Sequence, residues 1–530
     1  MFLTVFIYLG FLFSSLFISC QAEVNKGVNT ATSIQTAYYI SNDGNDNNNG
    51  SKEHPLKTFK KISRLTLNAG DSILLKGGQI FNGTLAINYN TNGTAQKLVV
   101  ITSYGIGIAT INSTNEKGLV INNSSYVIIQ NIKLLGAGRK NGNTTSGIDI
   151  AYCKNIAIDN IDVSGYQKSG LLIRNCSNMI VTNVMAHDNG SAGISVGGEN
   201  FLKTDCRNID IRYCRAENNP GDPTNKDNHS GSGIVIGQCT NAKISYCTAT
   251  NNGWDMPRIG NGPVGIWAWE SDSITIEHCL SYENKTSVGG QDGGGFDFDG
   301  GITNSVIQYC LSYGNQGSGI GLFQYNNASP WENNIIRYNI SINDGNVSDA
   351  KAGIYIWNQS PSNNLKNCAI YNNTIYNNKN AALSYSTITN NENIVFYNNI
   401  LVGNKEIILG KDSVSKYYGN CWYSLTNGFN VNGIANFDTW RNQKQQEIFN
   451  GAKTGINIDP AFANINTINI TDAKVLASFS MAKAANALLI NGGIDFQQLF
   501  NIPTGGKDFN GNAAQAKSIG ARFKSRKKIE

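Results

Sequence analysis

The sequence predicts an all-β protein built as a solenoid of short parallel strands, a β-helix. A unit of glycine, apolar, variable and apolar residues recurs eight times, at intervals of 23 to 40 residues, and a period near two dozen with insertions is typical of solenoids. Alternation with period 2 inside each unit indicates a strand. The 56 glycines and the many asparagines suit tight turns with left-handed backbone. The units begin at Gly147, Gly170, Gly193, Gly233, Gly265, Gly295, Gly319 and Gly353.

The amino-terminal segment predicts export. Residues 2–18 are mostly apolar and carry no charge, and they are too few to span a membrane comfortably. Ser19 and Cys20 follow, and they resemble a bacterial lipoprotein cleavage site. We expect residues 1–19 to be a signal peptide, Cys20 a lipid anchor and residues 20–37 a linker. The protein would then lie at the cell surface or in the periplasm; simple secretion after cleavage nearby is the alternative.

Phrases near both ends of the remaining chain frame the repeats. Residues 38–46 and 69–78 precede them, with a short predicted helix at 58–62 between these two stretches, and residues 507–511 and 518–523 follow them. A solenoid needs such caps, because its first and last coils would otherwise expose apolar surface and unpaired strand edges. These phrases resemble the opening and closing segments of exported bacterial right-handed parallel β-helix proteins of the pectate-lyase-like superfamily.

This resemblance implies a right-handed β-helix over residues 38–420, an N-terminal helical cap and a C-terminal capping segment over residues 421–530. Such proteins include polysaccharide lyases, glycoside hydrolases and epimerases. The resemblance therefore indicates a carbohydrate ligand but no single reaction, since one fold hosts many activities.

Ten cysteines after Cys20 follow the coil spacing and not a disulfide pattern. Each member of one series follows an aromatic residue, and Asn339 takes the same place in the next coil. We expect ladders of buried free thiols, in which cysteine acts as a small apolar residue. The two series are Cys153, Cys176, Cys206 and Cys239, and Cys214, Cys247, Cys279 and Cys310.

Three late units carry chemistry on their outward positions. Trp267 and Trp269 face outward in one unit, and Asp297 and Asp299 do so in the next. Parallel neighbours lie about 4.8 Å apart, so each tryptophan should lie beside an aspartate. Glu270 ends the tryptophan strand and should lie close to Asp299.

Carboxylates beside aromatic rings suit sugars, whose apolar faces stack on rings. We expect Asp297, Asp299 and Glu270 to form an acid–base set, with one pKa raised by its like-charged neighbours to supply a general acid. The spacing leaves inverting and retaining outcomes open. Two other interpretations are a solvated face and a Ca²⁺ site formed by Asp292, Asp297 and Asp299.

Further substrate contacts are expected from later strands and from two long insertions. The insertions, 220–232 and 253–263, should form one wall of a cleft, because long loops on a regular scaffold are usually functional. The expected contacts are Trp267, Trp269, Phe323, Gln324, Tyr355, Trp357, Lys226, His229 and Arg258.

The favoured prediction is a monomeric glycoside hydrolase that needs no cofactor and acts on a polysaccharide or oligosaccharide. A Ca²⁺-assisted polysaccharide lyase that uses Lys226 or Arg258 is the second prediction, and a non-catalytic surface glycan-binding or adhesive protein is the third. In some β-helix pectate lyases a lysine base occupies a comparable glycine-led strand, where this chain has aspartate. The net charge of +5 on 530 residues, without a basic stripe, argues against nucleic acid.

Overall fold

The computed structural model describes residues 35–198, 204–347, 352–388, 391–411, 414–463, 465, 468–479, 481–483 and 487–521. The predicted signal peptide, Cys20 and most of the predicted linker lie outside these residues. Among the described residues, no helix combines the length and apolar character needed to cross a membrane.

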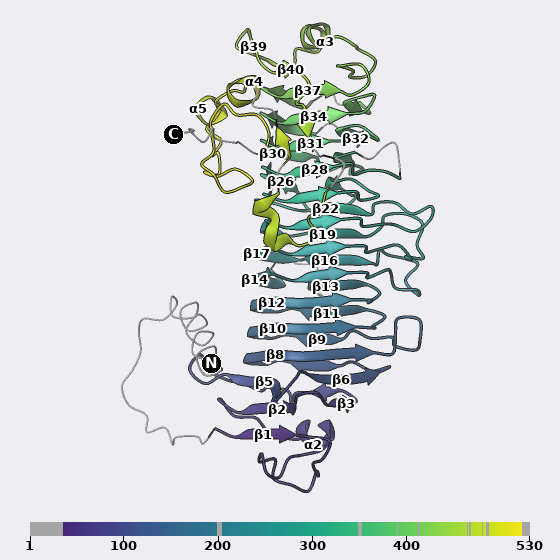
Figure 1. The fold of residues 1–530 in the computed structure, drawn as a ribbon, viewed down its shortest axis with the longest axis vertical. Coiled ribbons are helices and arrows are strands. Elements are labelled where there is room, and N and C mark those ends of the chain that lie inside the picture. Colours follow the sequence, from purple (N-terminus) through teal and green to yellow (C-terminus); the bar gives the residue numbers. More distant parts are fainter. Residues whose placement is uncertain are drawn as a thin grey trace, which may run out of the picture.

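The chain forms a stack of coils in which two parallel sheets run along the whole solenoid (Figure 1). The 12-stranded sheet carries the glycine-led units, one strand per coil. Its strands are β4 (Leu85–Ala86), β7 (Leu119–Asn122), β9 (Ile148–Ala151), β11 (Ser169–Arg174), β13 (Ala192–Gly197), β16 (Ser232–Gly237), β19 (Val264–Trp269), β22 (Gly294–Phe298), β25 (Ile320–Gln324), β29 (Ile354–Asn358), β32 (Leu383–Thr387) and β35 (Ile408–Leu409).

The 26-stranded sheet closes the other sides of the coils. Its strands are β1 (Ala37–Ile40), β2 (Ser72–Lys76), β3 (Ile80–Asn82), β5 (Val99–Tyr104), β6 (Ala109–Thr114), β8 (Ser125–Gly136), β10 (Lys154–Ser164), β12 (Ser177–His187), β14 (Cys206–Arg212), β15 (Arg215–Glu217), β17 (Cys239–Ser245), β18 (Thr248–Thr250), β20 (Asp272–Glu277), β21 (Leu280–Tyr282), β23 (Val306–Gln308), β24 (Leu311–Tyr313), β26 (Trp331–Glu332), β27 (Ile335–Arg337), β28 (Ile340–Ile342), β30 (Leu365–Tyr371), β31 (Thr374–Tyr376), β33 (Glu392–Tyr397), β34 (Ile400–Gly403), β36 (Lys416–Tyr418), β37 (Cys421–Ser424) and β40 (Ile456–Asn457).

The first apolar residue of each unit forms one continuous buried column, as the repeat predicts. Successive members pair in register from β9 to β29. Each member is at most 1% exposed. The column is Ile148, Leu171, Ile194, Ile234, Ile266, Phe296, Ile320 and Ile354. The outward positions of the same strands are therefore placed correctly.

Close packing across the coil explains why each unit begins with glycine. A Cβ atom at Gly265 would lie 2.0 Å from Ser281 Oγ, and one at Gly295 would lie 2.3 Å from Ser312 Oγ. Both serines belong to the 26-stranded sheet, on β21 and β24. Only a residue without a side chain lets the two sheets approach this closely.

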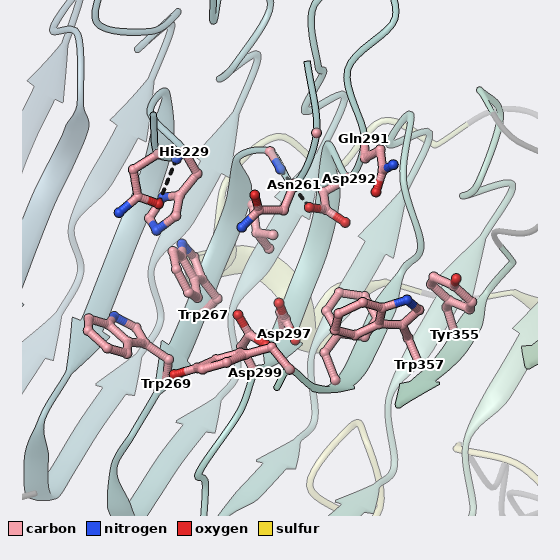
Figure 2. A pocket seen from close by; sticks show the side chains of 16 residues that line it. His229, Asn261, Trp267, Trp269, Gln291, Asp292, Asp297, Asp299, Tyr355 and Trp357 are labelled. Carbon is pink, nitrogen blue, oxygen red and sulfur yellow. Dashed lines mark hydrogen bonds between the residues drawn. The ribbon is translucent and has the colours of Figure 1, made fainter. Parts of the chain in front are cut away.

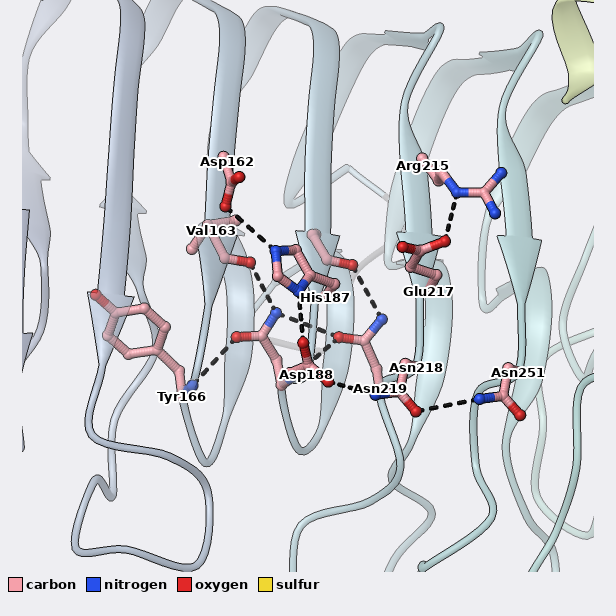
Figure 3. Close-up of polar contacts among 12 residues, drawn as sticks. Asp162, Val163, Tyr166, His187, Asp188, Arg215, Glu217, Asn218, Asn219 and Asn251 are labelled. Atoms are coloured by element: carbon pink, nitrogen blue, oxygen red, sulfur yellow. Dashed lines mark hydrogen bonds and ion pairs between the residues drawn. The ribbon is translucent and has the colours of Figure 1, made fainter. Parts of the chain in front are cut away.

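Two internal ladders run through the coils and each ends on a buried carboxylate. The predicted cysteine ladder is confirmed: all ten described cysteines are free and buried. Beyond Cys310 the ladder continues through Asn339 to Asn420, which donates to Glu447. In a second ladder, the backbone N–H of one residue donates to the side-chain oxygen of its counterpart in the next coil. This ladder runs from Asn189 through Asn219 and ends at Asp344. Figure 3 shows part of it.

Short helices lie at the ends, and the chain then returns along the outside. Helix α2 (Phe59–Ile62) buries both of its terminal residues in the core, and α3 (Phe437–Lys444) buries Phe437 and Trp440. The later segment lies along the 26-stranded sheet (Figure 1). Its apolar residues pack against Tyr282 and Tyr313 of that sheet. It contains β41 (Phe462–Ala463), η2 (Ala473–Ser478), β42 (Ala482–Lys483), α4 (Ala487–Asn491) and α5 (Phe496–Phe500), after the hairpin β38 (Ile448–Phe449) and β39 (Ala452–Lys453).

Candidate functional site

A pocket of about 590 Å³ opens on the outer face of the 12-stranded sheet (Figure 2). Strands β19, β22, β25 and β29 supply its floor, and the loops that precede β16, β19 and β22 supply a wall. The lining residues are Asn228, His229, Gly260, Asn261, Gly262, Val264, Trp267, Trp269, Gln291, Asp292, Asp297, Asp299, Phe323, Tyr325, Tyr355 and Trp357.

Strand register brings the predicted aromatic and acidic residues together on the floor. Trp267 pairs with Asp297, as predicted, and Asp297 pairs in turn with Gly321. Asp299 follows directly after β22, and its backbone N–H donates to the carbonyl of Ala268 at 2.9 Å. Further along the same face, Phe323 pairs with Trp357.

The two tryptophans differ in how much surface they offer to a ligand. Trp267 is only 4% exposed; its indole N–H donates to Ser232 Oγ at 3.2 Å, and the ring of His229 stands edge-on to it with centroids 4.7 Å apart. Trp269 is half-buried. Trp267 therefore supports the floor, and Trp269 offers the more accessible ring.

The predicted insertions do form one wall, and internal polar contacts hold them in place. In the first insertion, buried Asp222 pairs with Lys168 and its backbone N–H donates to Ser230 Oγ at 3.0 Å. In the second, the N–H of Gly262 donates to Asp292 Oδ2 at 2.6 Å. The bond from Gly262 thus joins the second insertion to Asp292, in the loop that precedes β22.

Asp299 and His229, both in the pocket lining, have displaced pKa values. Burial raises the pKa of Asp299 to about 7; the negative charges of Asp292 and Glu270 add to this, and the N–H of Gly300 opposes it. Burial lowers the pKa of His229 to about 4. Near neutral pH, Asp299 is thus partly protonated and the imidazole of His229 is neutral.

Glu270 does not line the pocket, contrary to the acid–base set predicted from the sequence. Its Oε1 accepts hydrogen bonds from Tyr325 Oη at 3.1 Å and from the N–H of Ser329 at 2.9 Å. The backbone of Glu270 is left-handed, with φ 43°. Glu270 lies one position beyond the outward-facing Trp269, and its carboxylate contacts Tyr325 and Ser329 and does not itself line the pocket.

Three predicted substrate contacts also lie outside the pocket. Gln324 is 0% exposed, with its side chain bonded to the carbonyl of Ser329 and the N–H of Gly301. Period-2 alternation places this residue inward, and Tyr325 lines the pocket in its place. Lys226 is exposed on its loop and Arg258 is half-buried, and neither reaches the lining.

Asp292, Asp297 and Asp299 do not form a three-carboxylate cluster, and the Ca²⁺ site expected from them stays a prediction. Within the described residues, no three His, Cys, Asp or Glu side chains are placed so that they could hold a metal ion together. The separation of Asp292 on the wall from the two floor aspartates accounts for this (Figure 2).

Four lining residues with polar side chains are absent from the sequence-based prediction: Asn228, Asn261, Gln291 and Tyr325. The first three lie in loops between units, where strand periodicity gives no direction for a side chain. Tyr325 follows the last residue of β25, where the alternation has just ended. The only feature of the sequence that could indicate a role for Tyr325 in binding is its aromatic ring, next to a strand with outward-facing residues.

Comparison with known proteins finds relatives with this β-helix fold that are named as carbohydrate-active enzymes. A curated lacto-N-biosidase from Bifidobacterium longum subsp. longum is 24% identical, over 67% of this chain but only 28% of that protein. The chain thus spans well under a third of that relative. Among solved structures, the native GH136 lacto-N-biosidase from Eubacterium ramulus matches with a TM-score of 0.50 and 18% identity, covering 67% of this chain and 68% of that one.

The pectate lyase Pel9A also matches, with a TM-score of 0.42 and 16% identity, covering 92% of this chain and 98% of that chain. The model of the Pel9A-like right-handed β-helix region matches residues 38–350, which is more than half of the chain. The match to this family model confirms the right-handed β-helix predicted from the segments at the two ends of the repeats. The chain belongs to the Pel9A-like family of right-handed parallel β-helix proteins.

Proposed function

We propose that this protein is a glycoside hydrolase that acts on a neutral oligosaccharide or polysaccharide. The observation that carries the proposal is Asp299, a carboxyl group with a pKa raised to about 7 in an aromatic pocket that holds two further carboxylates. Glycosidases use one protonated and one ionised carboxyl group, and environments that separate their pKa values assign the two roles.

Asp299 serves as the general acid in this proposal. Its proton passes to the glycosidic oxygen as the glycosidic bond breaks, so that the leaving sugar departs as an alcohol and positive charge builds up on the other sugar ring. Water supplies the new hydroxyl group on that ring, either activated directly by the second carboxylate or after that carboxylate has bonded to the sugar. Asp292 is the preferred second carboxylate, because it lines the loop wall above the floor and its charge acts on Asp299. Asp297, on the same strand as Asp299 but only 2% exposed, is less accessible to a sugar.

The charge of the pocket favours a neutral sugar over a uronate. The described lining contains three aspartates and no lysine or arginine, and the imidazole of His229 is neutral at pH 7. A uronate carboxylate would be repelled there, since like charges in a partly buried site are poorly screened. The rings of Trp269, Tyr325 and Trp357 offer surfaces for the apolar faces of sugars.

The names of similar proteins include both a glycosidase and a lyase. The name lacto-N-biosidase describes a glycosidase, and this chain covers 28% of that curated protein. The family model takes its name from Pel9A, which is a pectate lyase. Hydrolase and lyase must therefore be separated by experiment.

A glycan panel with product analysis tests the proposal. Purified protein should release reducing sugar from a neutral glycan without a product that absorbs near 235 nm, and chelation with EDTA should leave the rate unchanged. Absorbance near 235 nm that requires added Ca²⁺ would instead identify the lyase, with Lys226 and Arg258 at the loops as its cationic residues. Binding without turnover would identify a glycan-binding or adhesive protein.

We also propose that the mature protein is exported and anchored through lipid on Cys20. Radiolabelled palmitate supplied to expressing cells should label the wild-type protein and not the Cys20→Ser variant. Absence of label from both proteins would leave secretion without an anchor as the explanation, and equal labelling of both would show that the lipid is not on Cys20.

A further inference from the structure

The contact between Tyr325 and Glu270 links the pocket to a carboxylate outside it. Tyr325 follows β25 and Glu270 follows β19, and β22, which carries Asp297, lies between these two strands. The phenol of Tyr325 donates to Glu270 Oε1 at 3.1 Å, and the N–H of Ser329 donates to the same oxygen at 2.9 Å. One carboxylate oxygen thus holds both ends of the segment 325–329.

The coil that carries Asp299 lies between Glu270 and Tyr325, and it has two glycines where these two residues meet. Asp299 is followed by Gly300 and Gly301. A Cβ atom at Gly300 would lie 2.4 Å from the ring of Tyr325, and one at Gly301 would lie 2.5 Å from Glu270 Oε2. Any other residue at either position would displace the ring or the carboxylate. The sequence Asp299-Gly300-Gly301 therefore supplies both the acid and the space for its neighbour.

We infer that Glu270 is a positioning residue, which fixes Tyr325 as a sugar-contacting ring beside Asp299, and that Glu270 does not exchange protons with the substrate. Glu270 uses the phenolic hydrogen of Tyr325, so the phenolic oxygen keeps its lone pairs for a hydroxyl of the sugar. Burial and the charges of Glu270 and Asp299 raise the pKa of Tyr325, which keeps it a neutral phenol. This inference rests on the proposed function.

The test compares the conservative and the truncating change at Glu270. In Glu270→Gln the amide oxygen still accepts from Tyr325 and Ser329, so the ring stays in place, whereas Glu270→Ala removes both bonds. Glu283→Ala is the matched control, because Glu283 is an exposed glutamate with a left-handed backbone, φ 51°, outside the pocket.

Kinetics on the glycan that the panel identifies should separate the variants. Glu270→Ala and Tyr325→Ala should raise KM by about 10-fold, the order expected for losing one stacked ring. Glu270→Gln should keep KM within about 2-fold of wild type. Its kcat should fall by much less than the 10²-fold expected for the loss of an acid–base group. A kcat loss of 10²-fold or more in Glu270→Gln would overturn the inference and make Glu270 an acid or base.

A measurement without any glycan keeps the inference testable if the proposed function fails. Nitration by tetranitromethane, followed residue by residue by mass spectrometry, reports how firmly the ring of Tyr325 is held, with exposed Tyr89 as the internal reference. Tyr325 should react fastest in Glu270→Ala, more slowly in Glu270→Gln, where only the charge that raises its pKa is lost, and at the wild-type rate in Glu283→Ala. Equal rates in all four proteins would show that Glu270 does not position the ring.

Discussion

Asp292, on the loop wall of the pocket, adds its negative charge to the burial that raises the pKa of Asp299 on the floor. The two carboxylates come from one coil, but the first precedes β22 and the second follows it, so the strand carries them to different sides of the cavity. This arrangement gives one carboxyl group a proton near neutral pH and leaves a second carboxylate facing it.

Replacing Asp299 with asparagine should abolish most turnover. The change keeps size and hydrogen bonding but removes the proton, and a general acid contributes about 10²- to 10⁴-fold. We expect kcat on the identified glycan to fall by that order with an unchanged circular dichroism spectrum. Asp227→Asn, at an exposed carboxylate outside the pocket lining, is the control. Full activity in Asp299→Asn would place the catalytic centre elsewhere.

The pH dependence of kcat should show the coupling between the two aspartates. Asp299 must be protonated to act, so activity should fall as pH rises through about 7. Removing the charge of Asp292 in Asp292→Asn makes the proton on Asp299 less favourable and lowers its pKa. The alkaline limb of the residual activity should therefore move to lower pH. A limb that stays in place, or moves to higher pH, would contradict this coupling.

Strand periodicity predicted the floor of the pocket because it fixes direction along each unit. The glycine before each strand and the period of 2 placed Trp267, Asp297 and Tyr355 on the outer face, and the coil interval placed Trp267 beside Asp297. These features follow from local sterics and from register, both of which repeat from coil to coil. The buried column starting at Ile148 follows from the same two rules.

Residues just beyond the strands could not be placed in this way. Glu270 has a left-handed backbone, and Gln324, which the sequence predicts as a substrate contact, lies at a position that the period directs inward. The loop residue Asn261 depends on contacts between successive insertions, such as the bond from Gly262 to Asp292. Such contacts join segments with no common period, so the sequence pattern does not reveal them.

Trp269→Ala should weaken glycan binding with little effect on folding. Trp269 is half-buried and lines the pocket, whereas Trp267 is almost fully buried among apolar residues. Loss of a stacking ring should cost about 1–3 kcal/mol of binding free energy, which calorimetry in the Asp299→Asn background can measure. Trp267→Ala, in contrast, should lower the melting temperature. Unchanged affinity in Trp269→Ala would exclude this ring from the binding site.

The ten described cysteines should all react as thiols once the protein is unfolded. They are buried and free in the ladders, and burial raises the pKa of Cys214 and Cys247 well above the usual range. Native protein should therefore react slowly with Ellman's reagent, because the thiolate is the reactive form. Denatured, unreduced protein should release at least ten equivalents. Recovery of only a few thiols would indicate disulfides.

Asp344→Asn should stabilise the protein at neutral pH. Asp344 is the last acceptor of the ladder through Asn284 and Asn315, and burial raises its pKa to about 6. The asparagines of the ladder donate to a serine three residues earlier, Asn284 to Ser281 Oγ and Asn315 to Ser312 Oγ. Ser341 stands in the same place before Asp344, so an asparagine there finds a ready acceptor for its amide.

The sign of the effect follows from the raised pKa of Asp344. A carboxyl group that is harder to ionise in the folded state destabilises the protein as pH rises from about 4, its pKa when unfolded, through about 6, its pKa when folded. Asparagine does not titrate, so the stability gain of Asp344→Asn over wild type should grow between these two pH values and then level off at about 1–3 kcal/mol. Urea denaturation at pH 4, 6 and 8 measures this difference, with Asp227→Asn as the exposed control. A variant less stable than wild type at pH 8 would mean that the charged hydrogen bonds from Ser341 and Asn315 outweigh the cost of burying the carboxylate.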